Sequence, residues 1–126
     1  MILNFWKPVL WLIIVSTISL IPGNDIPSQI LLFPNFDKVI HFGMYFVLVL
    51  FLVFPLLKIK AVNTYLIAFL IAVLLGGILE ILQATIAINR TGSYIDFLAN
   101  LSGAIFGLIV YKWIISGKKV EVIFKA

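Results

Sequence analysis

The stretch TYLIAFLIAVLLGGILEILQATIAI, residues 64–88, decides the fold because it carries a single charged side chain, Glu80. A helix needs about 20 mostly apolar residues to cross the hydrocarbon core of a bilayer, so this stretch predicts a membrane-spanning helix. A charge near the centre of such a helix costs about 2.5 to 3.5 kcal/mol on insertion scales. We therefore expect Glu80 to face other helices rather than lipid, paired with Arg90 or lying near His41.

The rest of the chain is similarly apolar. Of its 126 residues, 63% are hydrophobic and 11% are charged, and the mean hydropathy is +1.23. A typical soluble domain is about half apolar, and one of this size leaves about a third of its unfolded surface exposed. The composition therefore predicts an integral membrane protein with one domain over residues 1–126. The sequence has no cysteine, which excludes disulfides and thiolate chemistry.

Four apolar stretches predict an all-α, polytopic membrane protein with four transmembrane helices. The predicted spans cover about 5–21, 37–57, 64–88 and 94–115. The first is short and has Lys7 near its start, as a signal peptide does, but it lacks an Ala-x-Ala cleavage site, so we expect a retained helix. The apolar segment 26–36 is short and flanked by prolines, and we expect it to lie along the membrane surface.

Lysine and arginine are distributed unequally between the two ends of the predicted spans. One end holds Lys7, Lys58, Lys60, Lys112, Lys118, Lys119 and Lys125, and the other holds Lys38 and Arg90. Cytoplasmic loops of membrane proteins carry an excess of these residues. The distribution predicts that both termini are cytoplasmic (N-in, C-in). It also accounts for the net charge of +4 without a nucleic-acid partner.

The polar residues of the spans gather at the end opposite the lysine-rich one. They are Asp37, Lys38, His41 and Tyr45 on the second span, Glu80 and Gln83 on the third, Arg90 and Ser93 in the loop, and Asp96 and Asn100 on the fourth. Residues three or four apart share one helix face. The pattern predicts an outward-facing pocket with Asp37, Arg90 and Asp96 at its rim. Glu80, about eight residues or roughly 12 Å inside its helix, is predicted to form the floor.

Small residues on the fourth span predict a helix contact. Gly103 and Gly107 are four residues apart, a spacing that allows membrane helices to approach closely. The polar residues of this span share the same face. We expect that face to pack on the third span, around Gly76 and Glu80.

Three motifs at these helix ends, taken together, resemble the VanZ-like family of membrane proteins. They are Asp37-Lys38-x-x-His41-Phe42-x-x-Tyr45, Glu80-x-x-Gln83 and Arg90-x-x-Ser93-x-x-Asp96-x-x-x-Asn100-x-x-Gly103. The resemblance implies a small multi-pass protein of the bacterial cytoplasmic (inner) membrane. The family's name comes from a protein linked to lower susceptibility to teicoplanin, which implies a connection with the cell envelope and glycopeptide tolerance. This chain departs from the family in having Ala87-Ile88-Asn89 before Arg90, where a proline or glycine is common.

Three kinds of function are compatible with the polar cluster. It could be a hydrogen-bonded network that holds helices together, alone or in a larger membrane complex. It could bind a lipid-linked or amphiphilic ligand or a membrane protein partner, with Arg90 and Lys38 holding phosphate or carboxylate. It could also be the site of an enzyme acting on a lipid or envelope substrate, with His41 and Glu80 as an acid–base pair. Binding is the function we expect.

A metal ion or cofactor has little support from the sequence alone. A set of Asp37, His41, Glu80 and Asp96 would suit a hard or intermediate ion, but their spacing matches no metal-binding motif, so none is expected. Ser93 could be a nucleophile, although a serine before an acidic first turn is typical of an N-cap, which is the expected role.

Overall fold

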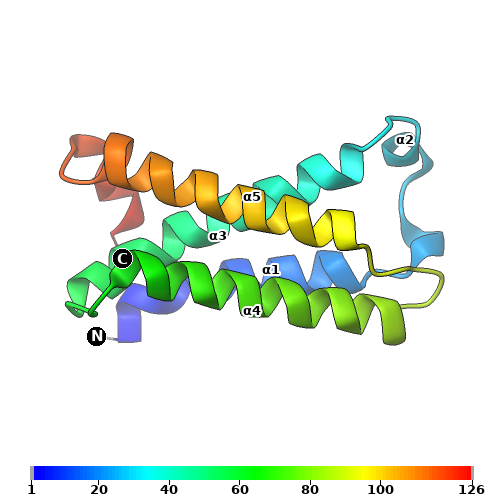
Figure 1. Cartoon of the computed structure of the whole chain (residues 1–126), viewed down its shortest axis with the longest axis horizontal. Helices are drawn as coiled ribbons and strands as arrows, with labels where there is room; N and C mark the ends of the chain where they lie inside the picture. Colours follow the sequence, from blue (N-terminus) through cyan, green and yellow to red (C-terminus); the bar gives the residue numbers. More distant parts are fainter. Residues whose placement is uncertain (1, 126) are drawn as a thin grey trace.

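The computed structural model describes residues 2–125 and consists of helices and turns, with no β-strand among these residues. The long helices are α1 (Trp6–Leu20), α3 (Phe36–Lys58), α4 (Thr64–Thr85) and α5 (Tyr94–Val110), and α5 continues as a π-helical turn, Tyr111–Ile115. The short elements are the 3-10 helices Ile2–Phe5, Gly23–Asp25 and Lys119–Phe124 and the helix α2, Ser28–Leu31. The predicted all-α fold is confirmed (Figure 1).

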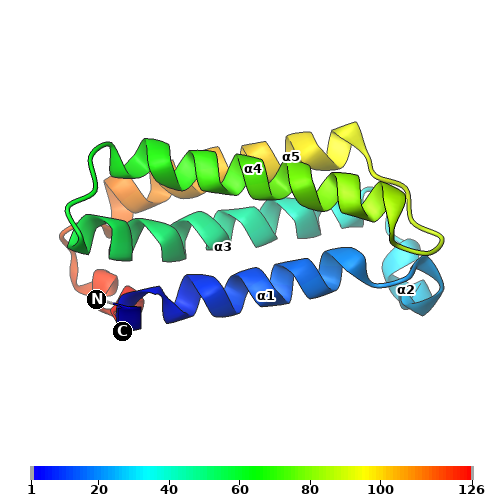
Figure 2. The same ribbon diagram turned by 90° about the horizontal axis from the view of Figure 1, so that it is seen from below.

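Three of the four predicted spans are long and apolar enough to cross a membrane. They are α3, α4 and the segment Tyr94–Ile115. Helix α1 is apolar but has only 15 residues, fewer than the about 20 that a helix perpendicular to the membrane needs. It lies along α3 and α4 on one side of the bundle (Figure 2). By length and composition, three helices of this chain could each cross a membrane, and α1 is the shortest of the four long helices.

The third helix ends earlier than predicted. Helix α4 stops at Thr85 instead of Ile88, and Asn89 takes a left-handed backbone conformation with φ 53°. The Ile88 carbonyl accepts a hydrogen bond from the Gly23 amide at 2.8 Å, so these residues pair with the α1–α2 connection instead of extending the helix. Glu80 consequently lies five residues inside α4, roughly 8 Å from its end rather than 12 Å.

The glycine face of α5 packs on α3, which corrects the expectation that it would pack on α4. A Cβ atom at Gly103 would overlap the carbonyl oxygen of Phe42, and one at Gly107 would lie 2.7 Å from the carbonyl oxygen of Phe46. Glycines allow this because they place no side chain between the two backbones. Gly76 on α4 makes room for side chains, since its Cβ position lies 3.3 Å from the Tyr45 ring and 3.4 Å from Asn100 Nδ2. The expected approach of the polar part of the α5 face to Gly76 is therefore confirmed, and only its glycines pack on α3 instead.

The segment after α5 closes the end of the bundle that holds both termini (Figure 1). Phe124 is buried against Phe51 and Tyr111, and the Tyr111 hydroxyl donates to Glu121 at 2.9 Å. Lys7 donates to the Ile123 carbonyl at 2.6 Å. The two termini therefore share the lysine-rich end of the bundle, and the predicted polar residues lie at the other end.

Candidate functional site

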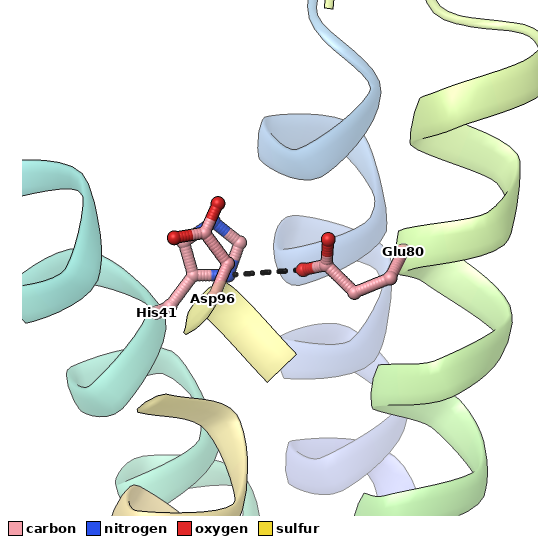
Figure 3. A group of neighbouring side chains, drawn as sticks. All are labelled: His41, Glu80 and Asp96. Atoms are coloured by element: carbon pink, nitrogen blue, oxygen red, sulfur yellow. Dashed lines mark ion pairs between the residues drawn. The ribbon is translucent and has the colours of Figure 1, made fainter. Parts of the chain in front are cut away.

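Three titratable side chains from three different helices meet at the polar end of the bundle (Figure 3). His41 Nδ1 lies 3.6 Å from Glu80 Oε1, and His41 Nε2 lies 3.9 Å from Asp96 Oδ2. His41 and Asp96 are buried, with exposed fractions of 5% and 7%. The expectation that Glu80 faces other helices near His41 is confirmed. Among the described residues Glu80 forms no ion pair with Arg90, the other partner considered.

Hydrogen bonds hold the first two of these side chains in place. Asn100 Oδ1 lies 3.0 Å from His41 Nδ1, an arrangement in which the ring nitrogen donates and the other nitrogen is directed toward Asp96. Glu80 Oε2 accepts a hydrogen bond from the Ser93 amide at 3.1 Å. The Glu80 carboxylate thus links α4 to the loop that precedes α5.

The start of α5 is arranged as the sequence predicts. The Ser93 hydroxyl accepts a hydrogen bond from the Asp96 amide at 3.4 Å, which makes Ser93 the N-cap of the helix. The cap fixes the first turn of α5, and so the position from which the Asp96 side chain reaches the cluster.

Lys38 bridges two carboxylates at the edge of this cluster. Its Nζ lies 2.7 Å from Asp37 Oδ2 and 3.2 Å from Asp96 Oδ1. The second contact is an ion pair without hydrogen-bond geometry, because Asp96 Oδ1 is buried and accepts no hydrogen bond from any described residue. Lys38 therefore offsets part of the negative charge but leaves this oxygen without a directed partner.

Two of the predicted residues are buried within the bundle instead. The Tyr45 ring is 1% exposed, packs beside Gly76, and its hydroxyl has no hydrogen-bond partner among the described residues. Gln83 is also 1% exposed and donates to the Ser19 carbonyl at 3.1 Å, which ties α4 to α1. Neither side chain lines the pocket described next.

A pocket of about 690 Å³ lies beside the cluster. Its polar lining includes Asp25, Asp37, Lys38, His41, Arg90, Ser93 and Asp96, and its apolar lining includes Ile18, Ile21, Ile26, Phe33, Ile40 and Met44. The three predicted rim residues are thus in the lining. Four other predicted residues do not line the pocket: Tyr45, Glu80, Gln83 and Asn100. Glu80 therefore does not form the predicted floor; it lies behind His41, which is a lining residue.

The wall contributed by α1 and the α1–α2 connection is absent from the sequence-based prediction. Ser19 is a buried polar residue on α1. Because a serine in an apolar helix usually needs a polar partner, this residue was the feature of the sequence that could have placed α1 next to the other polar groups. The main-chain bond from Gly23 to Ile88 draws the connection over the same end of the bundle. The first span therefore takes part in the site although it carries no acidic residue or histidine.

The cluster of His41, Glu80 and Asp96 also has the spacing of a metal site. One potential ligand atom from each residue lies within 4.8 Å of those from the other two. Asp37, the fourth residue considered from sequence, is not part of this group. Three helices bring together ligands that are far apart along the chain, which is why no motif revealed them.

The comparison with known families agrees with the three motifs. A family model described as VanZ/LLP1 matches residues 3–115, a range that covers α1 and all three helices of the cluster. No curated protein and no solved structure shows a significant match to the chain. The match extends over nearly the whole sequence and agrees with the apolar helices. The chain is thus a multi-pass membrane protein that belongs to the VanZ/LLP1 family.

Proposed function

We propose that this protein binds an amphiphile with an anionic headgroup, such as a phospholipid or a lipid-linked envelope intermediate, in the pocket of about 690 Å³. The observation that carries the proposal is the mixed lining of this pocket. It includes the cationic side chains of Lys38 and Arg90 together with isoleucine, methionine and phenylalanine side chains. The volume falls within the roughly 300 to 1,000 Å³ typical of small-molecule sites.

Arg90 is the residue best placed to hold the anionic group. It lines the pocket, is partly buried, and forms no ion pair with any acidic side chain in residues 2–125. A guanidinium binds phosphate through two parallel hydrogen bonds. Lys38 is already paired with Asp37 and Asp96, so it adds positive charge without being the main contact.

The apolar residues of the pocket indicate that its ligand also has an apolar part. Ile18 of α1 and Ile40 and Met44 of α3 line the space beside the charged residues. Burial of apolar surface contributes roughly 25 cal/mol per Å², so an acyl chain here would add affinity that a free phosphate ion lacks. The site therefore selects an amphiphile over a soluble anion.

Replacing Arg90 by alanine is expected to weaken binding of a short-chain anionic phospholipid about 10-fold or more. A hydrogen bond to a charged group contributes about 1.5 to 3 kcal/mol, and this substitution removes it. The measurement is titration of the purified protein in detergent with dihexanoyl phosphatidylglycerol, with inorganic phosphate titrated separately to distinguish a lipid from a free anion. Lys112→Ala, at the other end of the bundle, is the control and should bind normally. Equal affinity of wild type and Arg90→Ala would contradict the proposal.

We further propose that the pocket faces the outer leaflet of a bacterial cytoplasmic membrane. The supporting observation is that the termini lie together at the lysine-rich end, with the pocket at the other end. A periplasmic reporter such as alkaline phosphatase is expected to be active when fused after Arg90 and inactive when fused after Lys60. The reverse pattern would place the pocket at the cytoplasmic surface. The family name suggests a role in glycopeptide tolerance, and an envelope ligand bound at the outer leaflet would be consistent with that role.

A second function, acid–base chemistry on the bound headgroup, is favoured by the position of His41. Its ring lines the pocket, is oriented by Asn100, and lies between the carboxylates of Glu80 and Asp96. A histidine held in this way can accept a proton from a nucleophile and return it to a leaving group. Conversion of the phospholipid probe into a new product in the binding assay would distinguish an enzyme from a binding protein.

A further inference from the structure

We infer that His41, Glu80 and Asp96 form a binding site for a divalent first-row transition metal ion of the Zn²⁺ or Mn²⁺ type. The first reason is the spacing. One potential ligand atom from each of the three residues lies within 4.8 Å of those from the other two, and the distance of 3.9 Å between His41 Nε2 and Asp96 Oδ2 is longer than the roughly 2.7 to 3.2 Å of an N–H···O hydrogen bond. Ligands about 2.1 Å from a shared tetrahedral ion lie roughly 3.4 Å apart. The three groups are thus placed around a gap that an ion fits with small side-chain movements.

The second reason is the buried carboxylate of Asp96, which is 7% exposed. Its Oδ1 lies 3.2 Å from Lys38 Nζ but accepts no hydrogen bond from any residue in the described part of the chain, and its Oδ2 faces His41 Nε2 at 3.9 Å. A buried carboxylate is costly unless its charge and its hydrogen-bonding capacity are both satisfied. Lys38 is the only described lysine or arginine paired with Asp96, and it is shared with Asp37. A divalent ion bound by Asp96 Oδ2 and Glu80 would offset the negative charge of both carboxylates at once.

The third reason is the support around the three side chains. Metal-binding histidines usually engage their second ring nitrogen in a hydrogen bond that fixes the ring, and ligating carboxylates are themselves hydrogen-bonded. Here Asn100 holds His41 at 3.0 Å, and the Ser93 amide holds Glu80 at 3.1 Å. The cluster therefore has the outer contacts of a metal site in addition to its potential ligands.

The ligand types indicate which ions fit. One imidazole and two carboxylates, without sulfur, suit Zn²⁺ or Mn²⁺, whereas Ca²⁺ prefers six to eight oxygen ligands. His41 and Asp96 line the pocket, so the remaining coordination positions would be open to water or to a ligand oxygen. Coordination of a lipid phosphate would rest on the proposed function, but the metal site itself does not depend on it.

The test is metal binding by the full chain in detergent, with any affinity tag removed and the protein first treated with a chelator. Titration calorimetry with Zn²⁺, and electron paramagnetic resonance with Mn²⁺, are made without added lipid. We expect one ion per chain for the wild type with at least one of the two metals, and an affinity more than about 100-fold lower for both Glu80→Gln and Asp96→Asn. Glu121→Gln, which alters a carboxylate at the opposite end of the bundle and outside the cluster, should bind as the wild type does.

Folding of each variant is checked by size-exclusion chromatography and thermal unfolding, and His41→Gln serves as a third variant if one of the carboxylate variants fails to fold. Absence of saturable binding by the wild type with either metal would overturn the inference and leave the His41 ring itself as the group between the two carboxylates. Binding unchanged in the folded ligand variants would also overturn it, because the ion would then lie elsewhere. Since no lipid is added, the outcome is independent of the Arg90 experiment.

Discussion

Replacing Gly103 by alanine is expected to lower the free energy of unfolding by about 3 kcal/mol, the upper end of the usual cost of overpacking. The added methyl group would overlap the backbone carbonyl of Phe42 on α3, and a backbone atom cannot move aside as a flexible side chain can. The helices would have to separate along their whole contact, which includes Gly107 against Phe46. Thermal unfolding of the purified protein in detergent, together with the amount of monodisperse protein recovered, measures the effect.

Gly43 provides a matched control on the facing helix. A Cβ atom at this position of α3 meets nothing within 4 Å, so Gly43→Ala adds the same methyl group without a collision. Glycine within a helix is less stable than alanine by roughly 0.5 to 1 kcal/mol, so this variant is expected to be neutral or slightly stabilised. If Gly103→Ala proved as stable as Gly43→Ala, the close contact between α3 and α5 would be wrong.

Replacing Glu80 by alanine should destabilise the protein by about 3 to 5 kcal/mol, the usual effect of removing one partner from a buried charged group. The substitution removes one of the two carboxylates beside His41 and leaves the Ser93 amide without an acceptor. Glu80→Gln retains an oxygen for Ser93 and should cost less, about 1 to 2 kcal/mol. Equilibrium unfolding of the three proteins in the same detergent would give this ranking.

Glu121→Ala is the control for this experiment. Glu121, like Glu80, is a hydrogen-bonded carboxylate: it accepts from the Tyr111 hydroxyl and the Gly117 amide. It lies outside the apolar spans, at the end of the bundle that holds the termini. Its loss is expected to cost about 1 kcal/mol. If Glu80→Ala cost no more than Glu121→Ala, the cluster would contribute little to stability. A well-folded Glu80→Gln that fails to bind metal or lipid would then assign Glu80 to ligand binding.

Much of the architecture follows from apolar length and from the placement of polar residues at helix ends. A bilayer demands about 20 apolar residues per span, and this constraint makes α3, α4 and α5 visible in the sequence. The polar residues sort to one end because charges inside the apolar core are costly, so the meeting of His41, Glu80 and Asp96 could be anticipated. The Ser93 cap could also be predicted, since it depends on neighbouring residues alone.

Two other features depended on contacts that local sequence does not encode. The Gly103 and Gly107 spacing identifies a face that tolerates close approach, but α3 and α4 both offer apolar surfaces to it. Glu80 lies less deep in α4 than predicted because the helix ends at Thr85 and the loop that follows pairs with Gly23, a residue of the distant α1–α2 connection. Both outcomes arise from packing among helices separated by long stretches of chain.

The sequence by itself determined that this protein is helical and membrane-spanning, and that its scarce polar residues collect at one end. Those properties follow from the free-energy cost of placing charges, or backbone N–H and C=O groups without hydrogen bonds, in the hydrocarbon core. This cost applies to each segment of the chain separately. Only the tertiary structure decided that α5 packs on α3, that α1 forms a pocket wall, and that Glu80 lies behind His41. These depend on which side chains fit against one another, and that complementarity exists only once the four helices are assembled.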